Sequence, residues 1–238
     1  MSQSARYAIY YTPAKDHPIC LLGSEWLGRS AFTGDKIRRR EFDDINDDDI
    51  DRLTSSPSHY GFHATMKAPF ELHADRTEAE LVKHLHSFAR KQPVFDVNLS
   101  VKTLGQFLAL RLTSNFEAMR QLHEACVKDF DHFRAELSPD DIERRRRANL
   151  SPEQDARMLE WGYPYIFDDF RWHMTLSSRI VSESTRERLH GLLQDYFRPA
   201  LMSPLRVDGI AVYRQVDRRA PFNIIARASF PALADQPV

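Results

Sequence analysis

Two short histidine-containing triplets carry the clearest chemistry in this sequence. The triplet His63–Thr65 reads H-A-T, and the triplet His173–Thr175, which begins 110 positions later, reads H-M-T. Successive side chains of a β-strand point to opposite faces, so the spacing H-x-T puts an imidazole and a hydroxyl on one face. An imidazole titrates near neutral pH, and a hydroxyl can donate to an oxyanion. Two such units facing each other would therefore form a two-histidine phosphate site.

The same alternation predicts which side chains lie beside the two triplets. We expect Lys67 on the face of His63, and both Arg171 and Ser177 on the face of His173. The two cations would complement a phosphate dianion or a second phosphate. The alternative interpretation is that each cation lies at a strand end with its charged group in solvent.

Aromatic side chains flank the predicted strands on both sides. Tyr10, Tyr60 and Tyr163 are the candidates for substrate binding, because a phenol ring can stack on a base or close over a sugar. The competing interpretation is that these rings belong to the hydrophobic core.

The predicted elements occur in an order that repeats. Each triplet opens a strand that is followed by a helix and two further strands. The helix beginning at Thr77, with a capping box to Glu80, corresponds to a helix over residues 183–197. The duplication predicts that His63 and His173 lie on opposite walls of one cleft.

Residues 138–162 have no counterpart in the other repeat. Two segments within this range each begin with Ser-Pro followed by acidic residues, which is typical of short helices with serine N-caps. The run Arg144–Arg147 lies in the first of them. We interpret this run as a solvated helix face rather than a nucleic-acid patch, because acids precede it and the charges spread round the helix.

Composition narrows the class of protein further. The 238 residues can form one domain, and the net charge of −1 argues against a partner of long nucleic acid. No apolar window would span a bilayer, and Cys20 and Cys126 form no C-x-x-C pair, so we expect a cytoplasmic protein with reduced thiols. The acidic residues 43–51 lack the glycine and glutamate of a calcium loop, so no metal site is expected. P-loop and dinucleotide-binding motifs are absent from the sequence.

With both triplets and the duplication in view, the chain resembles the 2H phosphoesterase superfamily over nearly its full length. Five stretches resemble one branch of it, a family of uncharacterised proteins associated with bacterial phosphonate-utilisation (C–P lyase) operons. These stretches are RYAIYYTP, SEWLGRSAFTG, HYGFHATMKAPF, FLALRL and WGYPYIFDDFRWHMTL.

The resemblance implies a fold and a set of catalytic residues. The implied fold is a single α+β domain over residues 1–238, duplicated and two-lobed, with two antiparallel sheets facing a central cleft and helices outside. Its lobes are residues 1–113 and 163–238, joined by helices in 114–162. The superfamily's catalytic residues correspond to His63, Thr65, His173 and Thr175.

The resemblance also implies metal-independent chemistry, without a cofactor, on a cyclic phosphate or phosphodiester. The expected substrate is a small sugar phosphate or nucleotide, and the resemblance to that branch implies a role in phosphonate catabolism. Two alternatives stay open: an RNA-end cyclic phosphodiesterase or 2′–5′ ligase, and a non-catalytic module that binds a nucleotide or phosphosugar. The sequence does not specify an oligomeric state.

Overall fold

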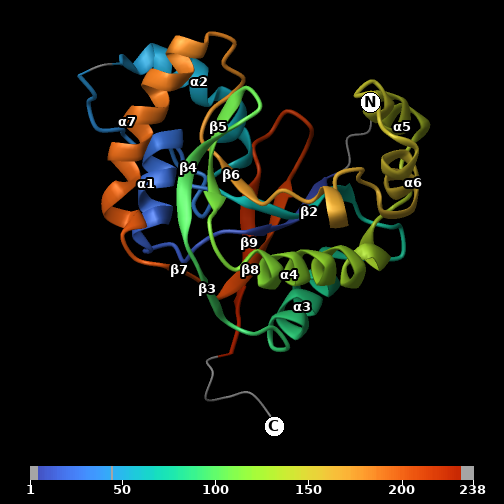
Figure 1. Ribbon diagram of the computed structural model, residues 1–238. Coiled ribbons are helices and arrows are strands. Elements are labelled where there is room, and N and C mark those ends of the chain that lie inside the picture. Colours follow the sequence, from blue (N-terminus) through green and yellow to red (C-terminus); the bar gives the residue numbers. More distant parts are fainter. Residues whose placement is uncertain (1–4, 44, 232–238) are drawn as a thin grey trace.

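The computed structural model describes residues 5–43 and 45–231 (Figure 1). The strands are β1 (Arg6–Tyr11), β2 (Ala64–Glu71), β3 (Phe95–Val97), β4 (Leu99–Leu104), β5 (Phe107–Leu112), β6 (His173–Thr175), β7 (Leu205–Val207), β8 (Gly209–Gln215) and β9 (Asn223–Ser229). The α-helices are α1 (Pro18–Leu27), α2 (Asp47–Tyr60), α3 (Glu78–Ala89), α4 (Phe116–Asp129), α5 (Pro139–Arg146), α6 (Pro152–Trp161) and α7 (Glu183–Leu201). Two 3₁₀ turns, η1 (Asp131–Phe133) and η2 (Phe167–Asp169), complete the list. The α+β class is confirmed.

The strands form one large antiparallel sheet in the order β4-β5-β6-β2-β1-β8-β9, and β3 pairs with β7 beside it. We expected two sheets facing a cleft. Instead, the two halves join edge to edge where β2 meets β6, through the single register pair Ala64 and Met174. The two strands that carry the triplets, β2 and β6, therefore pair with each other.

The two sequence repeats are interwoven in space. The second triplet strand, β6, pairs with β5 of the first repeat, whereas β2 lies next to β1, which pairs with β8 of the second. The helices follow the same exchange: α7 packs on β4 and β5, and α3 packs on β8 and β9. In Figure 1, α1 and α7 therefore lie on one side of the molecule, and α3 and α4 on the other. Each half of the sheet combines residues from both 1–113 and 163–238.

Side-chain alternation divides the sheet into two faces. Along β1, Tyr7, Ile9 and Tyr11 enter the large core that the helices cover, while Ala8 and Tyr10 join a small cluster on the opposite face. The middle residues of both triplets are fully buried in the large core. Their flanking histidines and threonines therefore point to the face of Tyr10, as the H-x-T spacing predicts.

Capping side chains set most helix starts where the sequence predicts them. Thr77 forms the expected capping box with Glu80, and Ser138 and Ser151 cap the two short helices α5 and α6. These two helices lie together at one edge of the molecule (Figure 1).

Glycines end the first two helices. Gly28 follows α1 with a left-handed φ of 70°. Helix α2 continues through Pro57 to Tyr60, and Gly61 ends it.

None of the helices in the described ranges is long and apolar enough to cross a membrane. Both cysteines are buried and unpaired. The core accounts for their burial, since free cysteine behaves as a small apolar residue.

Candidate active site

The two H-x-T triplets lie side by side on neighbouring antiparallel strands. Because Ala64 is in register with Met174, antiparallel geometry sets His63 opposite Thr175 and Thr65 opposite His173. Side chains that face each other across such a pair have Cβ atoms roughly 4.5–5.5 Å apart. The two histidines and two threonines thus form one compact group with pseudo-twofold symmetry. They share one sheet, which corrects the expectation of opposite walls.

The two imidazoles are oriented in the same way. The Nδ1 atom of His63 lies 2.8 Å from the carbonyl oxygen of Gly61, and Nδ1 of His173 lies 2.6 Å from that of Arg171. A carbonyl oxygen can only accept, so each Nδ1 carries the hydrogen and each Nε2 is left as the basic nitrogen. The Nε2 of His63 lies 3.4 Å from Oγ1 of Thr65.

Packing fixes the position of His63. The ring of Tyr10 stacks on it with centroids 3.9 Å apart, and the ring centroid of Tyr213 lies 6.0 Å from that of His63. Gly61 has a left-handed φ of 78°, and a Cβ atom there would lie 2.6 Å from Cβ of Ala31. A glycine is therefore required where α2 ends, at the residue whose carbonyl holds the imidazole.

Both imidazoles favour the neutral form in the free protein. The pKa of His63 is lowered to about 4, chiefly by burial; the Gly61 carbonyl opposes this shift, and the neighbouring His173 adds to it. Burial also lowers the pKa of His173, and the cation of Arg111 on the adjacent strand adds to this effect.

One cavity of about 410 Å³ brings these groups together. It contains all four residues of the two triplets that were predicted to be catalytic, together with the predicted tyrosines. Its lining residues are Arg6, Tyr10, Ser56, Pro57, Tyr60, His63, Thr65, Ala68, Pro69, Arg144, Arg145, Tyr163, His173 and Thr175. The volume suits a small ligand, in keeping with the usual size of such sites.

Lys67 does not lie in this cavity, contrary to the prediction. Its ammonium is buried, donates to the Val127 carbonyl at 3.0 Å and pairs with Asp131 at 2.8 Å. The cause is a β-bulge: Tyr10 is in register with Thr65 but Ile9 with Lys67, so one extra residue shifts Lys67 to the core side. Alternation alone cannot reveal a bulge.

Ser177 differs from its predicted place, whereas Arg171 lines a cavity together with His173, as predicted. Ser177 is buried, and its hydroxyl accepts a hydrogen bond from the Leu108 amide at 2.9 Å, so it holds β5 rather than a ligand. The exposed Arg171 lines an adjoining cavity of about 460 Å³ that shares Thr65, His173 and Tyr163 with the first. Its contact with substrate stays a prediction.

Sequence reasoning missed three arginines that line the histidine cavity. Arg6, Arg144 and Arg145 lie there, two of them from the run that we interpreted as a solvated helix face. Arg6 could have been found, because it stands at even spacing from Ala8 and Tyr10 on β1. The direction of the α5 arginines could not, since it depends on how that helix packs.

A metal site is not evident from the side chains. Within residues 5–43 and 45–231, no group of three or more histidine, cysteine, aspartate or glutamate side chains could hold a metal ion.

The fold and the site define an α+β protein whose paired H-x-T triplets meet at the centre of one sheet. The chain belongs to the family described as Protein of unknown function (DUF1045), whose model matches residues 65–223. That region contains Thr65 and the whole second triplet.

Two named relatives match over most of this chain. A protein of Janthinobacterium sp. (strain Marseille) named ribose 1,5-bisphosphate phosphokinase PhnN is 34% identical over 222 residues, which are 91% of this chain and 49% of that protein. A protein of the same name from Laribacter hongkongensis (strain HLHK9) is 31% identical over 219 residues, covering 92% of this chain and 50% of that protein. The chain thus spans about half the length of these relatives.

Solved structures that align with the chain are distant in sequence. LigT of E. coli, crystallised with NADP+, is 14% identical, with a TM-score of 0.42 over 97% of this chain and 100% of that one. A phosphoesterase crystal structure is 13% identical with a TM-score of 0.42, covering 96% and 99%. A conserved protein of unknown function from Agrobacterium tumefaciens str. C58 is 11% identical with a TM-score of 0.43, covering 94% and 85%.

Proposed function

We propose that this protein is a metal-independent phosphoesterase of the 2H type that hydrolyses a cyclic phosphate or phosphodiester of a small sugar phosphate or nucleotide. The observation that carries the proposal is the register pair of Ala64 and Met174, which groups both histidines and both threonines on one face. Each histidine has its Nδ1 bound to a carbonyl and its Nε2 left free to exchange protons.

The chemistry needs one histidine in each protonation state. The neutral imidazole takes a proton from water as the water oxygen bonds to phosphorus, and the protonated imidazole gives its proton to the leaving alkoxide as the P–O bond breaks. Thr65 and Thr175 donate to the non-bridging oxygens. General acid or base catalysis contributes about 10²–10⁴-fold in rate, and one oxyanion donor roughly 3 kcal/mol.

The cavity and the relatives support the proposed class of substrate. The lining combines tyrosine rings with arginines and no carboxylate, which suits a phosphorylated sugar or nucleoside. The relatives' name refers to a ribose bisphosphate, which supports a phosphorylated ribose and a role in phosphonate catabolism. We do not propose kinase activity for this protein, because its sequence has no P-loop motif to bind the phosphates of a nucleoside triphosphate.

A panel of substrates tests the proposal. The purified protein, in excess chelator, is incubated with adenosine 2′,3′-cyclic phosphate, with the same nucleotide carrying a 5′-phosphate, and with an oligonucleotide ending in a 2′,3′-cyclic phosphate, and products are followed by ³¹P NMR. We expect ring opening of a small cyclic phosphate in the presence of chelator. Turnover that requires added metal would contradict the mechanism. Tight binding without product would identify a binding module instead.

A further inference from the structure

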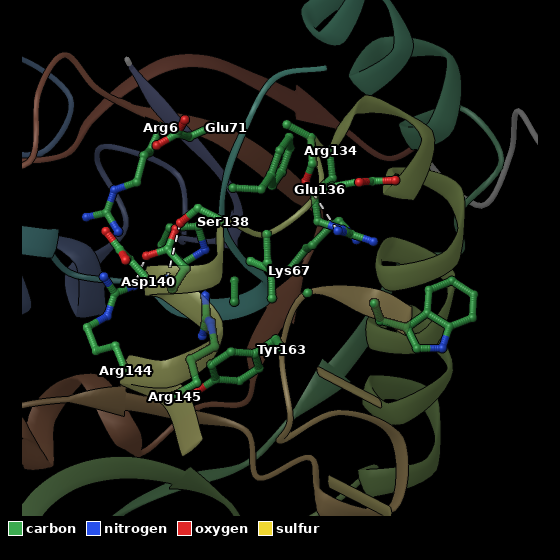
Figure 2. A pocket seen from close by; sticks show the side chains of 18 of the residues that line it. Arg6, Lys67, Glu71, Arg134, Glu136, Ser138, Asp140, Arg144, Arg145 and Tyr163 are labelled. Atoms are coloured by element: carbon green, nitrogen blue, oxygen red, sulfur yellow. Dashed lines mark hydrogen bonds and ion pairs between the residues drawn. The ribbon is translucent and has the colours of Figure 1, made fainter. Parts of the chain in front are cut away.

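A cluster of arginines stands beside the histidine pair with little negative charge to balance it. Arg6, Arg144 and Arg145 line both the histidine cavity and an adjoining cavity of about 390 Å³. Figure 2 shows all three on the same side of that adjoining cavity, with Arg134 on the other. Not one of the residues that line the histidine cavity is an aspartate or glutamate.

Arg145 is the most unusual member of the cluster. Its Nε atom is buried and has no hydrogen-bond partner among residues 5–43 and 45–231. The guanidinium lies over the ring of Tyr163, 5.4 Å from the centroid. Burial lowers its pKa, and Arg144 lowers it too, while Tyr163 and Asp141 oppose the shift. A partly buried cation without a bonded anion gains free energy when an anion binds to it, so the site can accept one.

Among the residues that the structure describes, no carboxylate forms an ion pair with Arg145. Asp141 is the acid that contributes to the environment of Arg145, but it is bound by Arg144 at 2.5 Å and by Arg218 at 3.2 Å. Arg218 also pairs with Glu71 at 3.1 Å. These acids line the adjoining cavity only, and they hold the outer arginines.

Arg6 is hydrogen-bonded to a neutral side chain. Its Nε and Nη2 atoms donate to the Gln215 side-chain oxygen at 2.8 and 2.5 Å, and its guanidinium lies over the ring of Phe222. Burial lowers its pKa, and the cation of Arg218 lowers it further. Within the described part of the chain, the other N–H groups of its guanidinium donate to no protein group, so they can bind an anion in the cavity that Arg6 lines.

The arginines are displaced from the reacting groups. Arg6 precedes Tyr10, the residue stacked on His63, by four positions on β1, which is about 13 Å of strand at roughly 3.3 Å per residue. A long side chain covers part of that length. An anion held there is separated from the phosphate between the histidines by about the size of a sugar ring, so the same phosphate would not occupy both places.

We infer that Arg6 and Arg145, with Arg144 at the rim, form a second anion subsite that binds a second phosphate of the substrate. The inference rests on the proposed function and narrows its substrate class to molecules with two separated phosphates. Guanidinium groups suit this task, because their planar N–H pairs match two phosphate oxygens at once.

Binding of product-like nucleotides tests the subsite without requiring turnover. Calorimetry compares adenosine 2′,5′-bisphosphate with adenosine 2′-monophosphate on the wild type, on Arg145→Gln and on Arg6→Gln. We expect the wild type to bind the bisphosphate at least tenfold more tightly. Each variant is expected to lose most of this preference, about 10- to 100-fold for a charge-assisted contact, so its affinity for the bisphosphate should fall far more than its affinity for the monophosphate.

Two controls keep the result interpretable. Arg90→Gln removes the same charge from an exposed residue outside the cavities and should keep the preference. Arg145→Lys keeps the charge and should retain part of the preference for the bisphosphate. Circular dichroism verifies that every variant is folded. Equal affinity of the wild type for both ligands, or a preference that survives in Arg145→Gln and Arg6→Gln, would overturn the subsite. Failure of the phosphoesterase proposal would appear separately, as absent turnover with the binding preference intact.

Discussion

At the scale of single residues, the carbonyls of Gly61 and Arg171 hold both imidazoles in one tautomer, with Nε2 available for proton transfer. This symmetry leaves the assignment of acid and base to the orientation of the substrate. A group that donates a proton must be protonated beforehand, however, and burial lowers the pKa of both histidines. The pH dependence of catalysis is therefore set by burial.

The pH profile of kcat/KM is expected to be bell-shaped with its maximum below pH 6.5. The base works only above its lowered pKa, which is about 4 if His63 is the base, and the acid loses its proton as pH rises through its own lowered pKa. The measurement is kcat/KM on a cyclic phosphate from pH 4 to 9. A maximum above pH 8 would be inconsistent with histidine as the acid.

The sequence predicts some of these residues and not others. His63 and His173 are predictable, because the H-x-T spacing recurs within a repeated order of elements. Their neighbours are harder to predict, since period-two alternation holds only along an unbroken strand. The bulge in β2 moves Lys67 to the core, and the direction of Arg145 depends on a helix whose packing leaves no residue fully buried.

At the scale of elements, β2 and α4 are tied together by the buried ammonium of Lys67. It bonds the Val127 carbonyl at the end of α4 and the carboxylate of Asp131, which Arg134 also holds. Burial lowers the pKa of Lys67, and Asp131 opposes the shift. The ion pair thus positions the strand that carries His63 and Thr65.

Lys67→Met should lower stability without impairing substrate binding. The apolar side chain keeps the volume but leaves Asp131 with Arg134 alone, at a cost of about 1–3 kcal/mol in the free energy of unfolding. Urea denaturation measures the loss, and Lys83→Met at an exposed site is the control. A stable variant whose KM rises tenfold would instead return Lys67 to the substrate site.

At the scale of the whole molecule, the two repeats exchange elements, and this exchange brings the two H-x-T triplets together at the centre of the sheet. Each half of the sheet uses strands from both repeats, and the halves join at Ala64 and Met174. The order of elements is predictable from the sequence, but the exchange is not, because nothing local specifies which hairpin a triplet strand will pair with.

The folded protein should lose stability in acid through buried neutral histidines. His123 is 2% exposed, stacks on Phe170 at 3.6 Å, and has its pKa lowered by burial to about 4. The unfolded chain, with a pKa near 6.5, binds more protons between these values, so stability is present above pH 6.5 and is lost as pH falls toward 4.

The corresponding experiment compares the unfolding free energies of wild type and His123→Leu. The free energy of unfolding of the wild type, relative to that of His123→Leu, should fall by about 2 kcal/mol between pH 7 and pH 4.5. Only the wild type has an imidazole at this position, and protonating it destabilises the folded state. The exposed His86→Leu serves as the control. Parallel pH curves for wild type and His123→Leu would show that His123 does not contribute to the acid sensitivity.

One measurement tests the central claim most directly: kcat/KM on a small cyclic phosphate for wild type, His63→Ala, His173→Ala and the control His86→Ala. We predict that each of the first two variants loses about 10²–10⁴-fold while it stays folded, and that the control is unchanged. Loss in both variants is required, because one histidine supplies the base and the other the acid. Retention of wild-type kcat/KM by either folded variant would contradict the two-histidine mechanism.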